Sequence, residues 1–256
     1  MKQRILINIL SQKIPRYISE ILTSSEDERF EVRHKKDKTM VTNIDEKISS
    51  LVKTELKNIF GDHYNFYCEE DHSELFYPAV VLDPIDGTKG LVTGTHECSV
   101  SLAFMETPVI SEGFGWIFNP FTGLSVATDD ISLDLENKQV DPPLGLVSRT
   151  EWGKGIYKDL VLGNMLIAPM GSIAFKLGLL ATGACHFIIS AYPKNIWDIA
   201  GGSILCKQRN ILLFNAKAEE ILILDKEYIK GPMFWCKKEL APRIMDIINQ
   251  RRENEL

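Results

Sequence analysis

The sequence predicts a mixed α/β fold, because helical and strand-like hydrophobic patterns both recur along it. Residues 43–60 place apolar side chains at helical spacing, whereas residues 99–104 alternate polar and apolar side chains as a half-buried strand does. The chain has 256 residues, of which 45% are hydrophobic and 25% charged, so it can bury a sizeable core. We therefore expect one large domain or two closely joined ones.

The first half is predicted to begin with two helices and to continue with strands. One helix spans residues 3–22, with a break expected before Pro15. The second spans residues 43–60, where Thr42 is the expected N-cap and Gly61 ends the helix. Strands are then predicted at residues 64–68, 79–83, 97–105, 112–118 and 123–128.

The second half alternates strands and helices. Helices are predicted at residues 171–182, 197–208 and 238–250, between strands at residues 145–148, 185–190, 211–215 and 232–236. A polar stretch at residues 128–143 separates the two patterns. We therefore expect an N-terminal α+β subdomain at residues 1–140 and a C-terminal α/β subdomain at residues 141–256.

Charge and cysteine content exclude several classes of partner. The net charge of −6 argues against a nucleic acid polymer, which binds to basic surfaces. The apolar stretches are too short for a membrane span, and the N-terminus lacks the features of a secretory signal. Five cysteines without a Cys-x-x-Cys pair favour reduced thiols over disulfides or zinc. We expect a cytoplasmic protein with no membrane partner.

Residues 82–89, Leu-Asp-Pro-Ile-Asp-Gly-Thr-Lys, form the most informative motif. It follows an apolar run, so Asp83 and Asp86 are expected where a buried strand stops and the chain turns. Two carboxylates fixed at a strand end attract a hard cation, while Gly87 allows close backbone approach and Thr88 offers a hydroxyl at a helix start. Alone, the motif is also compatible with a turn whose acids are solvated.

Three further acidic sites lie at the ends of predicted elements. Glu69 and Glu70 follow the first predicted strand, whereas Asp45 and Asp198 lie in the first turns of two predicted helices. An acid in a first helical turn complements the helix dipole, so Asp45 or Asp198 alone would not indicate a site. Acids at four separated positions together favour a metal site.

These motifs resemble, in their order and approximate spacing, those of the inositol monophosphatase superfamily of Mg²⁺-dependent, lithium-sensitive phosphomonoesterases. The family carries a Glu-Glu pair, then Asp-Pro-(Ile/Leu)-Asp-Gly-Thr, then Trp-Asp-x-Ala, which match residues 69–70, 83–88 and 197–200. Residues 35–45 resemble a further family segment, although Met40 stands where proline is usual. The resemblance implies a layered α-β-α-β-α sandwich of the inositol monophosphatase and fructose-bisphosphatase type, with the site between the two halves.

The resemblance also implies which residues hold metal ions. Glu69, Asp83 and the carbonyl of Ile85 would bind one Mg²⁺. Asp83, Asp86 and Asp198 would bind a second, so that Asp83 bridges the two ions. We expect two or three Mg²⁺ ions in total.

Other matching residues are implied to act on water and on the substrate phosphate. Thr88, hydrogen-bonded to Asp45, would orient the attacking water. Glu70 would steady a metal-bound water. The backbone amides of Gly87 and Thr88 would bind the phosphate.

The resemblance does not identify the substrate, because the chain departs from each of two branches of the family. Lys89 and Lys176 are similar to lysines of the 3'(2'),5'-bisphosphate nucleotidase branch, where an extra lysine suits a second phosphate, and we expect both to bind substrate. The chain departs from that branch at residues 90–91 and at Ser190, where an arginine is expected. It departs from the inositol phosphatases at Ala191, which fills the position of an acid that holds inositol hydroxyls.

We therefore expect a phosphatase of small phosphorylated metabolites that releases phosphate from adenosine 3',5'-bisphosphate. An inositol-1-monophosphatase, or a phosphatase of histidinol or sugar phosphates, is the alternative. A non-catalytic relative that binds Mg²⁺ or a nucleotide is a further alternative, which the intact set of acidic residues disfavours. The sequence leaves open whether the chain forms a homodimer.

Overall fold

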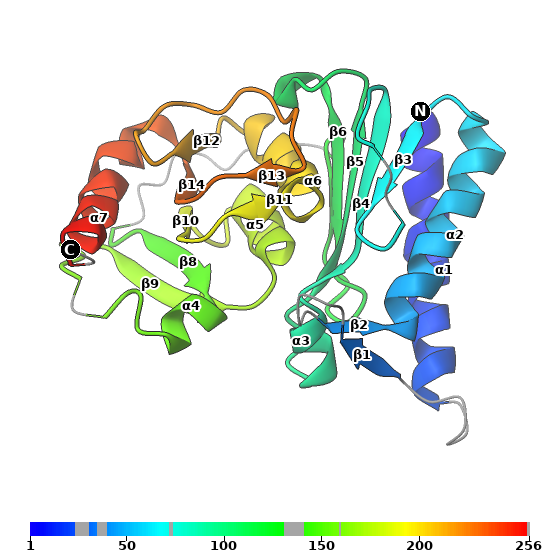
Figure 1. Cartoon of the computed structure of the whole chain (residues 1–256), viewed down its shortest axis with the longest axis horizontal. Helices are drawn as coiled ribbons and strands as arrows, with labels where there is room; N and C mark the ends of the chain where they lie inside the picture. Colours follow the sequence, from blue (N-terminus) through cyan, green and yellow to red (C-terminus); the bar gives the residue numbers. More distant parts are fainter. Residues whose placement is uncertain (24–30, 35–39, 72–73, 131–140, 159, 255–256) are drawn as a thin grey trace.

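The computed structural model describes residues 1–23, 31–34, 40–71, 74–130, 141–158 and 160–254. The predicted subdomain boundary at residue 140 falls in residues 131–140, which lie outside the described residues, so the division into subdomains stays a prediction. The described residues form five layers in the order α-β-α-β-α, which confirms the predicted sandwich (Figure 1).

The first layer is a pair of helices, α1 (Lys2–Thr23) and α2 (Asn43–Phe60). The predicted bounds of α2 match the structure, with Thr42 as N-cap and Gly61 as C-cap. The break expected before Pro15 is wrong, because α1 runs through this proline. The apolar face of α1 continues on both sides of Pro15 and is buried, so packing keeps the helix whole.

The first sheet covers these two helices and has the strand order β3-β4-β5-β6-β7. Strands β3 and β4 are parallel, and the other neighbours are antiparallel. The bounds are Asn65–Cys68 for β3, Ala79–Asp86 for β4, Ser99–Met105 for β5, Phe114–Phe118 for β6 and Ser125–Ala127 for β7.

Strand β4 contains an irregularity that decides where its acids point. The strand does not stop at Asp83 as predicted but continues to Asp86, and its register with β5 shifts between them. Asp83 pairs with Ser101, and Asp86 pairs with Ser99. In a regular strand, residues three apart face opposite sides, but one inserted residue restores the same side. Both aspartates therefore face the third layer.

The third layer consists of α5 (Ile173–Ala181) and α6 (Ile196–Lys207), which share one core with both sheets. Glycines let α6 lie close to the first sheet. A Cβ on Gly115 of β6 would lie 2.2 Å from the carbonyl oxygen of Gly201, and a Cβ on Gly201 would lie 2.9 Å from that of Leu102. The Ser101 hydroxyl also donates to the Trp197 carbonyl at 3.0 Å. These contacts fix the N-terminal turn of α6 against β5.

The second sheet has the order β12-β14-β10-β8-β9, and α7 (Ala241–Asn254) covers its outer face. Strands β8, β9 and β10 are parallel, while β14 is antiparallel to both β10 and β12. The bounds are Leu144–Ser148 for β8, Leu166–Met170 for β9, Phe187–Ser190 for β10, Leu212–Asn215 for β12 and Met233–Cys236 for β14.

Several short elements were not predicted. They are strand β9, the strands β1 (Val32–His34), β2 (Met40–Thr42), β11 (Lys194–Asn195) and β13 (Tyr228–Ile229), the helix α4 (Arg149–Gly153), and the 3₁₀ helix η2 (Ile110–Glu112). The helix predicted at residues 238–250 begins as the 3₁₀ helix η3 (Lys238–Leu240) and continues as α7. Helix α3 (Thr88–Val92) begins at Thr88, as the motif predicts.

None of the helices among the described residues combines the length and hydrophobicity of a membrane span. All five cysteines are buried free thiols.

The contact between Gly115 and Gly201 makes a prediction about stability. Gly115→Ala should lower the free energy of unfolding by about 1–3 kcal/mol, because its Cβ would meet backbone that has no flexible side chain to move. Urea unfolding followed by circular dichroism measures this change. Gly153→Ala is the matched control, since nothing lies within 4 Å of its Cβ. Equal stability of the two variants would contradict close packing of α6 on the sheet.

Candidate metal and active site

Three carboxylates meet between the first sheet and α6. Asp83 and Asp86 come from β4, and Asp198 comes from the first turn of α6. One carboxylate oxygen of each lies within 4.8 Å of the others, which makes this set a candidate site for a metal ion. We refer to Asp83, Asp86 and Asp198 as the acidic cluster.

Two members of the acidic cluster are held by hydrogen bonds to protein groups. Oδ2 of Asp86 accepts from the Ser172 hydroxyl and from the backbone amide of Ala174, each at 2.6 Å. Oδ2 of Asp198 accepts from the backbone amide of Asn195 at 3.2 Å, as part of the capping box of α6. These contacts orient the two carboxylates before any ligand binds.

Asp83 differs from the other two because it is almost wholly buried and one of its oxygens lacks a protein partner. The side chain is 1% exposed, and Oδ1 has no hydrogen-bond partner among the described residues. A buried carboxylate oxygen without a donor is costly unless a cation or a proton satisfies it.

Burial and like charge together raise the pKa values of the cluster. Burial raises the pKa of Asp83 well above its ordinary value, and the charges of Glu69, Asp86 and Asp198 raise it further. Burial, followed by the charge of Asp86, raises the pKa of Asp198 to about 7, although Lys194 opposes this shift. Holding all three carboxylates ionised therefore requires added positive charge.

The cluster fits a hard divalent cation on three observations. Its donors are all oxygens, which suit Mg²⁺ better than zinc. A cation would satisfy Oδ1 of Asp83, which is buried without a hydrogen-bond partner among the described residues, and its charge would offset the burial and repulsion that raise the pKa values. Asp83, Asp86 and Asp198 would hold the ion.

The other predicted metal residues lie close to this cluster. Glu69 directly follows β3, where its amide donates to the Leu82 carbonyl at 3.2 Å, and its charge acts on Asp83. Glu69 and the adjacent Glu70 are half-buried. The Ile85 carbonyl accepts from the Thr88 hydroxyl at 3.1 Å. Metal binding by Glu69 and Ile85, and the water contact of Glu70, stay predictions.

Thr88 and Asp45 lie together as the resemblance implies. The Thr88 hydroxyl oxygen lies 3.5 Å from Oδ1 of Asp45, at the limit of hydrogen-bond distance. Oδ2 of Asp45 accepts from the amide and hydroxyl of Thr42 at 2.9 and 2.5 Å. Burial, opposed by these hydrogen bonds and aided by the charges of Glu70 and Glu69, raises the pKa of Asp45 to about 7. Asp45 can therefore exchange a proton near neutral pH.

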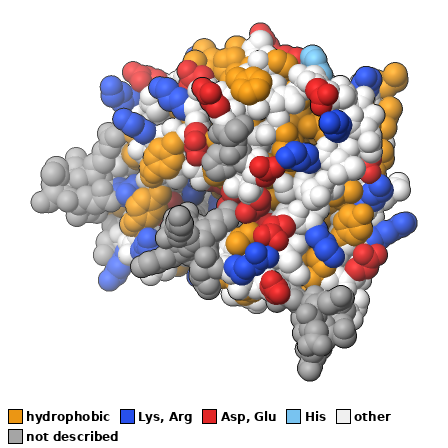
Figure 2. Space-filling model, turned by 45° about the vertical axis from the view of Figure 1, so that its right-hand side comes forward, with side chains coloured by type: hydrophobic (Ala, Val, Ile, Leu, Met, Phe, Trp, Pro, Cys, Tyr) orange, Lys and Arg blue, Asp and Glu red, His pale blue; other side chains and the backbone are white. Residues whose placement is uncertain are grey.

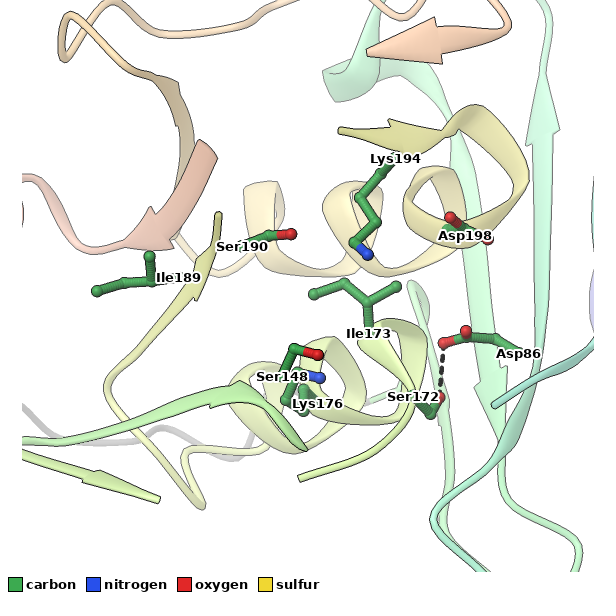
Figure 3. Close-up of a pocket in the computed structure, with 9 residues that line it drawn as sticks. All are labelled: Asp86, Ser148, Ser172, Ile173, Lys176, Ile189, Ser190, Lys194 and Asp198. Carbon is green, nitrogen blue, oxygen red and sulfur yellow. Dashed lines mark hydrogen bonds between the residues drawn. The ribbon is translucent and has the colours of Figure 1, made fainter. Parts of the chain in front are cut away.

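A pocket of about 120 Å³ opens beside the acidic cluster, between α5, α6 and the second sheet (Figure 3). Its polar lining combines two lysines and three serines with two members of the cluster: Lys176, Lys194, Ser148, Ser172, Ser190, Asp86 and Asp198. In Figure 3, the Lys194 ammonium and the Ser190 hydroxyl point into the space between these elements. The pocket therefore brings two ammonium groups and three hydroxyls next to the acidic cluster.

The predicted substrate-binding residues differ in their burial and in their position relative to the pocket. Lys176 lines the pocket and is 2% exposed, whereas Lys89 is exposed on α3 and is not among the lining residues. Gly87 has a φ of 87°, and a Cβ there would lie 2.6 Å from the Glu97 carbonyl oxygen, so only glycine fits. Phosphate binding by the amides of Gly87 and Thr88 stays a prediction.

Four further lining residues were not among those predicted to bind substrate: Lys194, Ser148, Ser172 and Ser190. Ser172 had a usable signal, because it follows Gly171 at a helix start and is the N-cap of α5, with its hydroxyl accepting from the Phe175 amide. The others sit at strand ends, whose convergence depends on the order of strands in the second sheet.

Charges on the outside of the molecule are mixed. On the face shown in Figure 2, acidic and basic side chains are interspersed with hydrophobic ones and do not gather into one basic stripe. The described residues on that face therefore form no extended basic surface for a nucleic acid backbone.

Comparison with known proteins gives a consistent result. The sequence matches the model of the inositol monophosphatase family over residues 5–139. A fructose-1,6-bisphosphatase/inositol-1-monophosphatase of Thermotoga maritima is 25% identical over 209 residues, covering 75% of this chain and 77% of the relative. The 3'(2'),5'-bisphosphate nucleotidase CysQ of Haemophilus influenzae is 23% identical over 228 residues, covering 79% of this chain and 82% of the relative.

The fold also has close structural counterparts. An IMPase of Thermotoga maritima superposes with a TM-score of 0.80 at 20% sequence identity, and the match covers 99% of each chain. At this identity the likeness shows that the two proteins share a fold.

The raised pKa values predict how metal-free stability depends on pH. Because the pKa values of Asp45, Asp83 and Asp198 are higher in the folded state, the folded chain binds more protons than the unfolded chain above about pH 4. These groups therefore stabilise the fold at low pH, and this contribution is lost as pH rises through about 7. In EDTA, the Tm should fall more steeply between about pH 5 and about pH 8 for the wild type than for Asp83→Asn.

Thermal unfolding followed by circular dichroism tests this prediction. Mg²⁺ should raise the Tm of the wild type most at the higher pH, where the carboxylates are ionised, and should raise that of Asp83→Asn far less. Identical pH profiles for the two proteins in EDTA would show that the cluster is not a source of repulsion.

Proposed function

Because this chain belongs to the inositol monophosphatase family and is a metal-dependent phosphomonoesterase, we propose that its substrate is a nucleoside 3'(2'),5'-bisphosphate such as adenosine 3',5'-bisphosphate. The observation that carries this proposal is the pairing of Lys176 and Lys194 in the pocket that Asp86 and Asp198 also line. A phosphate at the acidic cluster would leave the lysines available for a second one.

The burial of Lys176 supports a role in binding an anion. Its ammonium donates to the Met170 carbonyl at 3.1 Å and retains two further donors. Burial lowers its pKa to about 8, while Asp86 acts in the opposite direction. The side chain therefore stays mostly charged at neutral pH, in a position where an unpaired charge is costly. A substrate phosphate would satisfy that charge.

The carboxylates of the pocket argue for a bisphosphate over a substrate with one phosphate and many hydroxyls. Among the described lining residues, the acids are Asp86 and Asp198, which belong to the acidic cluster. Ala191, which is buried, supplies no carboxylate for polyol hydroxyls. The Haemophilus influenzae nucleotidase is also among the relatives of the chain.

In the reaction we propose, each group near the cluster has a separate task. Two or three Mg²⁺ ions, held at the acidic cluster, would neutralise charge at the phosphoryl oxygens and would acidify a water. The Thr88 hydroxyl, which in this structure lies 3.1 Å from the Ile85 carbonyl and 3.5 Å from Asp45, would donate its single proton to Asp45 and accept a hydrogen bond from the attacking water. Asp86 and Asp198 keep their orientation through Ser172 and Asn195, and Lys176 orients the substrate by its second phosphate.

An inositol or sugar monophosphate is the second candidate. Three serine hydroxyls line the pocket, from Ser148, Ser172 and Ser190, and hydroxyls can bind those of a polyol as well as phosphate oxygens. The inositol monophosphatase 1 of Solanum lycopersicum is also a relative, 25% identical over 230 residues.

A substrate panel distinguishes the candidates. Phosphate release should be measured from adenosine 3',5'-bisphosphate, inositol 1-phosphate, histidinol phosphate and fructose 1,6-bisphosphate, with Mg²⁺ and with EDTA. We expect kcat/KM for the nucleoside bisphosphate to exceed that for inositol 1-phosphate by at least about tenfold, because a site built for a charged group rejects analogues without it. A preference for inositol 1-phosphate would overturn the proposal.

The two predicted lysines can be compared directly. Lys176→Met should lower kcat/KM for the bisphosphate by about tenfold or more and should change it little for a monophosphate. Methionine has a similar volume and needs no partner, so the fold should be retained. Lys89→Ala is the matched comparison, and its exposure predicts the smaller effect. Equal losses on both substrates in Lys176→Met would place this lysine at the scissile phosphate.

A further inference from the structure

Glu97 connects parts of the site that are far apart in the sequence. It lies between α3 and β5, in the same half as Asp86, and its side chain is 17% exposed. Its Oε2 accepts from the Gly171 amide at 2.7 Å and from Nε of Arg149 at 2.9 Å, and the second oxygen pairs with the same guanidinium. Gly171 and Arg149 both belong to the second half. The carboxylate of Glu97 therefore bridges the two halves beside the pocket.

The contact with Gly171 leads directly to the acidic cluster. Gly171 precedes Ser172, the N-cap of α5, whose hydroxyl donates to Asp86 at 2.6 Å. The Ala174 amide donates to the same oxygen of Asp86. The start of α5 thus determines the orientation of Asp86, and Glu97 holds the residue before that start.

The backbone on both sides of this contact is strained. His96 and Ser172 have φ values of 56° and 51°, in the left-handed region that non-glycine residues rarely adopt. Such conformations cost about 1–3 kcal/mol each and persist only where surrounding contacts enforce them. Around His96, the ring stacks on Phe121 with centroids 4.4 Å apart, and the carbonyl accepts from Asn119 at 2.9 Å.

The backbone of Glu97 also packs against the start of α3, which follows β4. A Cβ on Gly87 or on Gly90 would lie 2.6 Å from the Glu97 carbonyl oxygen. The side chain and backbone of Glu97 thus touch both segments that adjoin Asp86, one on each side.

We propose that Glu97 is a positioning residue for the metal site. Paired with Arg149, it fixes the turn at Gly171 and Ser172, so that Ser172 and Ala174 hold Asp86 in the orientation that binds a divalent cation. Glu97 acts through these residues and touches neither the metal nor the substrate. The inference depends on the acidic cluster and not on which phosphomonoester is hydrolysed.

Two measurements, the stability of the metal-free protein and its Mg²⁺ affinity, distinguish a positioning role of Glu97 from a merely structural ion pair. Arg149 is 52% exposed, and exposed pairs contribute about 0–1 kcal/mol to stability. Arg149→Ala should therefore have little effect on the Tm of the metal-free protein. Removal of groups that orient a metal ligand, in contrast, weakens metal binding by about 10–100-fold.

The test measures Mg²⁺ binding to the whole chain by isothermal titration calorimetry, without substrate. Glu97→Ala should weaken Mg²⁺ binding by about tenfold or more. Glu97→Gln, which keeps an acceptor for the Gly171 amide, and Arg149→Ala should each give an intermediate loss. Glu220→Gln is the matched control, because Glu220 forms a similar pair with Lys207 and does not line the pocket.

Two results would overturn the proposal. One is an Mg²⁺ affinity of Glu97→Ala within about twofold of the wild type, whatever happens to its activity. The other covers the case in which Glu97→Ala does not fold: Arg149→Ala changes only a half-exposed side chain, and an unchanged Mg²⁺ affinity in that variant rejects positioning by the pair. A loss in Glu220→Gln equal to that in Arg149→Ala would reject it as well.

Discussion

Mutual repulsion among buried carboxylates is the constraint on which the rest of this structure depends. The oxygens of Asp83, Asp86 and Asp198 lie within 4.8 Å of one another. Two like charges about 4 Å apart near a protein surface repel each other by about 4 kcal/mol. Such a cluster is stable only when protons or a cation lie between the carboxylates. Until a cation binds, the surrounding strands and helices must hold these side chains close together.

Three separate devices provide this restraint. The register shift in β4 turns Asp83 and Asp86 to the same side of the sheet. The glycines of α6 and β6 let the helix lie close enough for Asp198 to reach them. The N-terminal turn of α5 then holds Asp86 through Ser172. Each device is rigid for a different reason, namely strand pairing, close backbone packing and capping, so loosening one leaves the other two in place.

Much of this could be predicted from local sequence patterns, and the rest depends on contacts between distant residues. The bounds of α2 follow from periodicity and from Thr42 and Gly61, and the acids of the cluster follow from their positions at element ends. The register shift in β4 arises from pairing with β5, which the pattern of β4 alone does not contain. The bridge from Glu97 to Arg149 joins residues 52 positions apart, and both look like ordinary surface charges in the sequence. Lys89 and Lys176 were equivalent as motif residues, and only packing separates an exposed lysine from a buried one.

The middle layer has a consequence for how the molecule unfolds. Helices α5 and α6 belong to one continuous core with residues from both sheets, so neither sheet can lose its cover without exposing the other. The same layer carries Asp198 and the donors to Asp86. An opening that separates the two sheets must therefore also dismantle the cation site. A cation bound there would suppress such openings throughout the chain, and backbone amides in β12 and β14, far from the cluster along the sequence, would exchange with solvent more slowly as well.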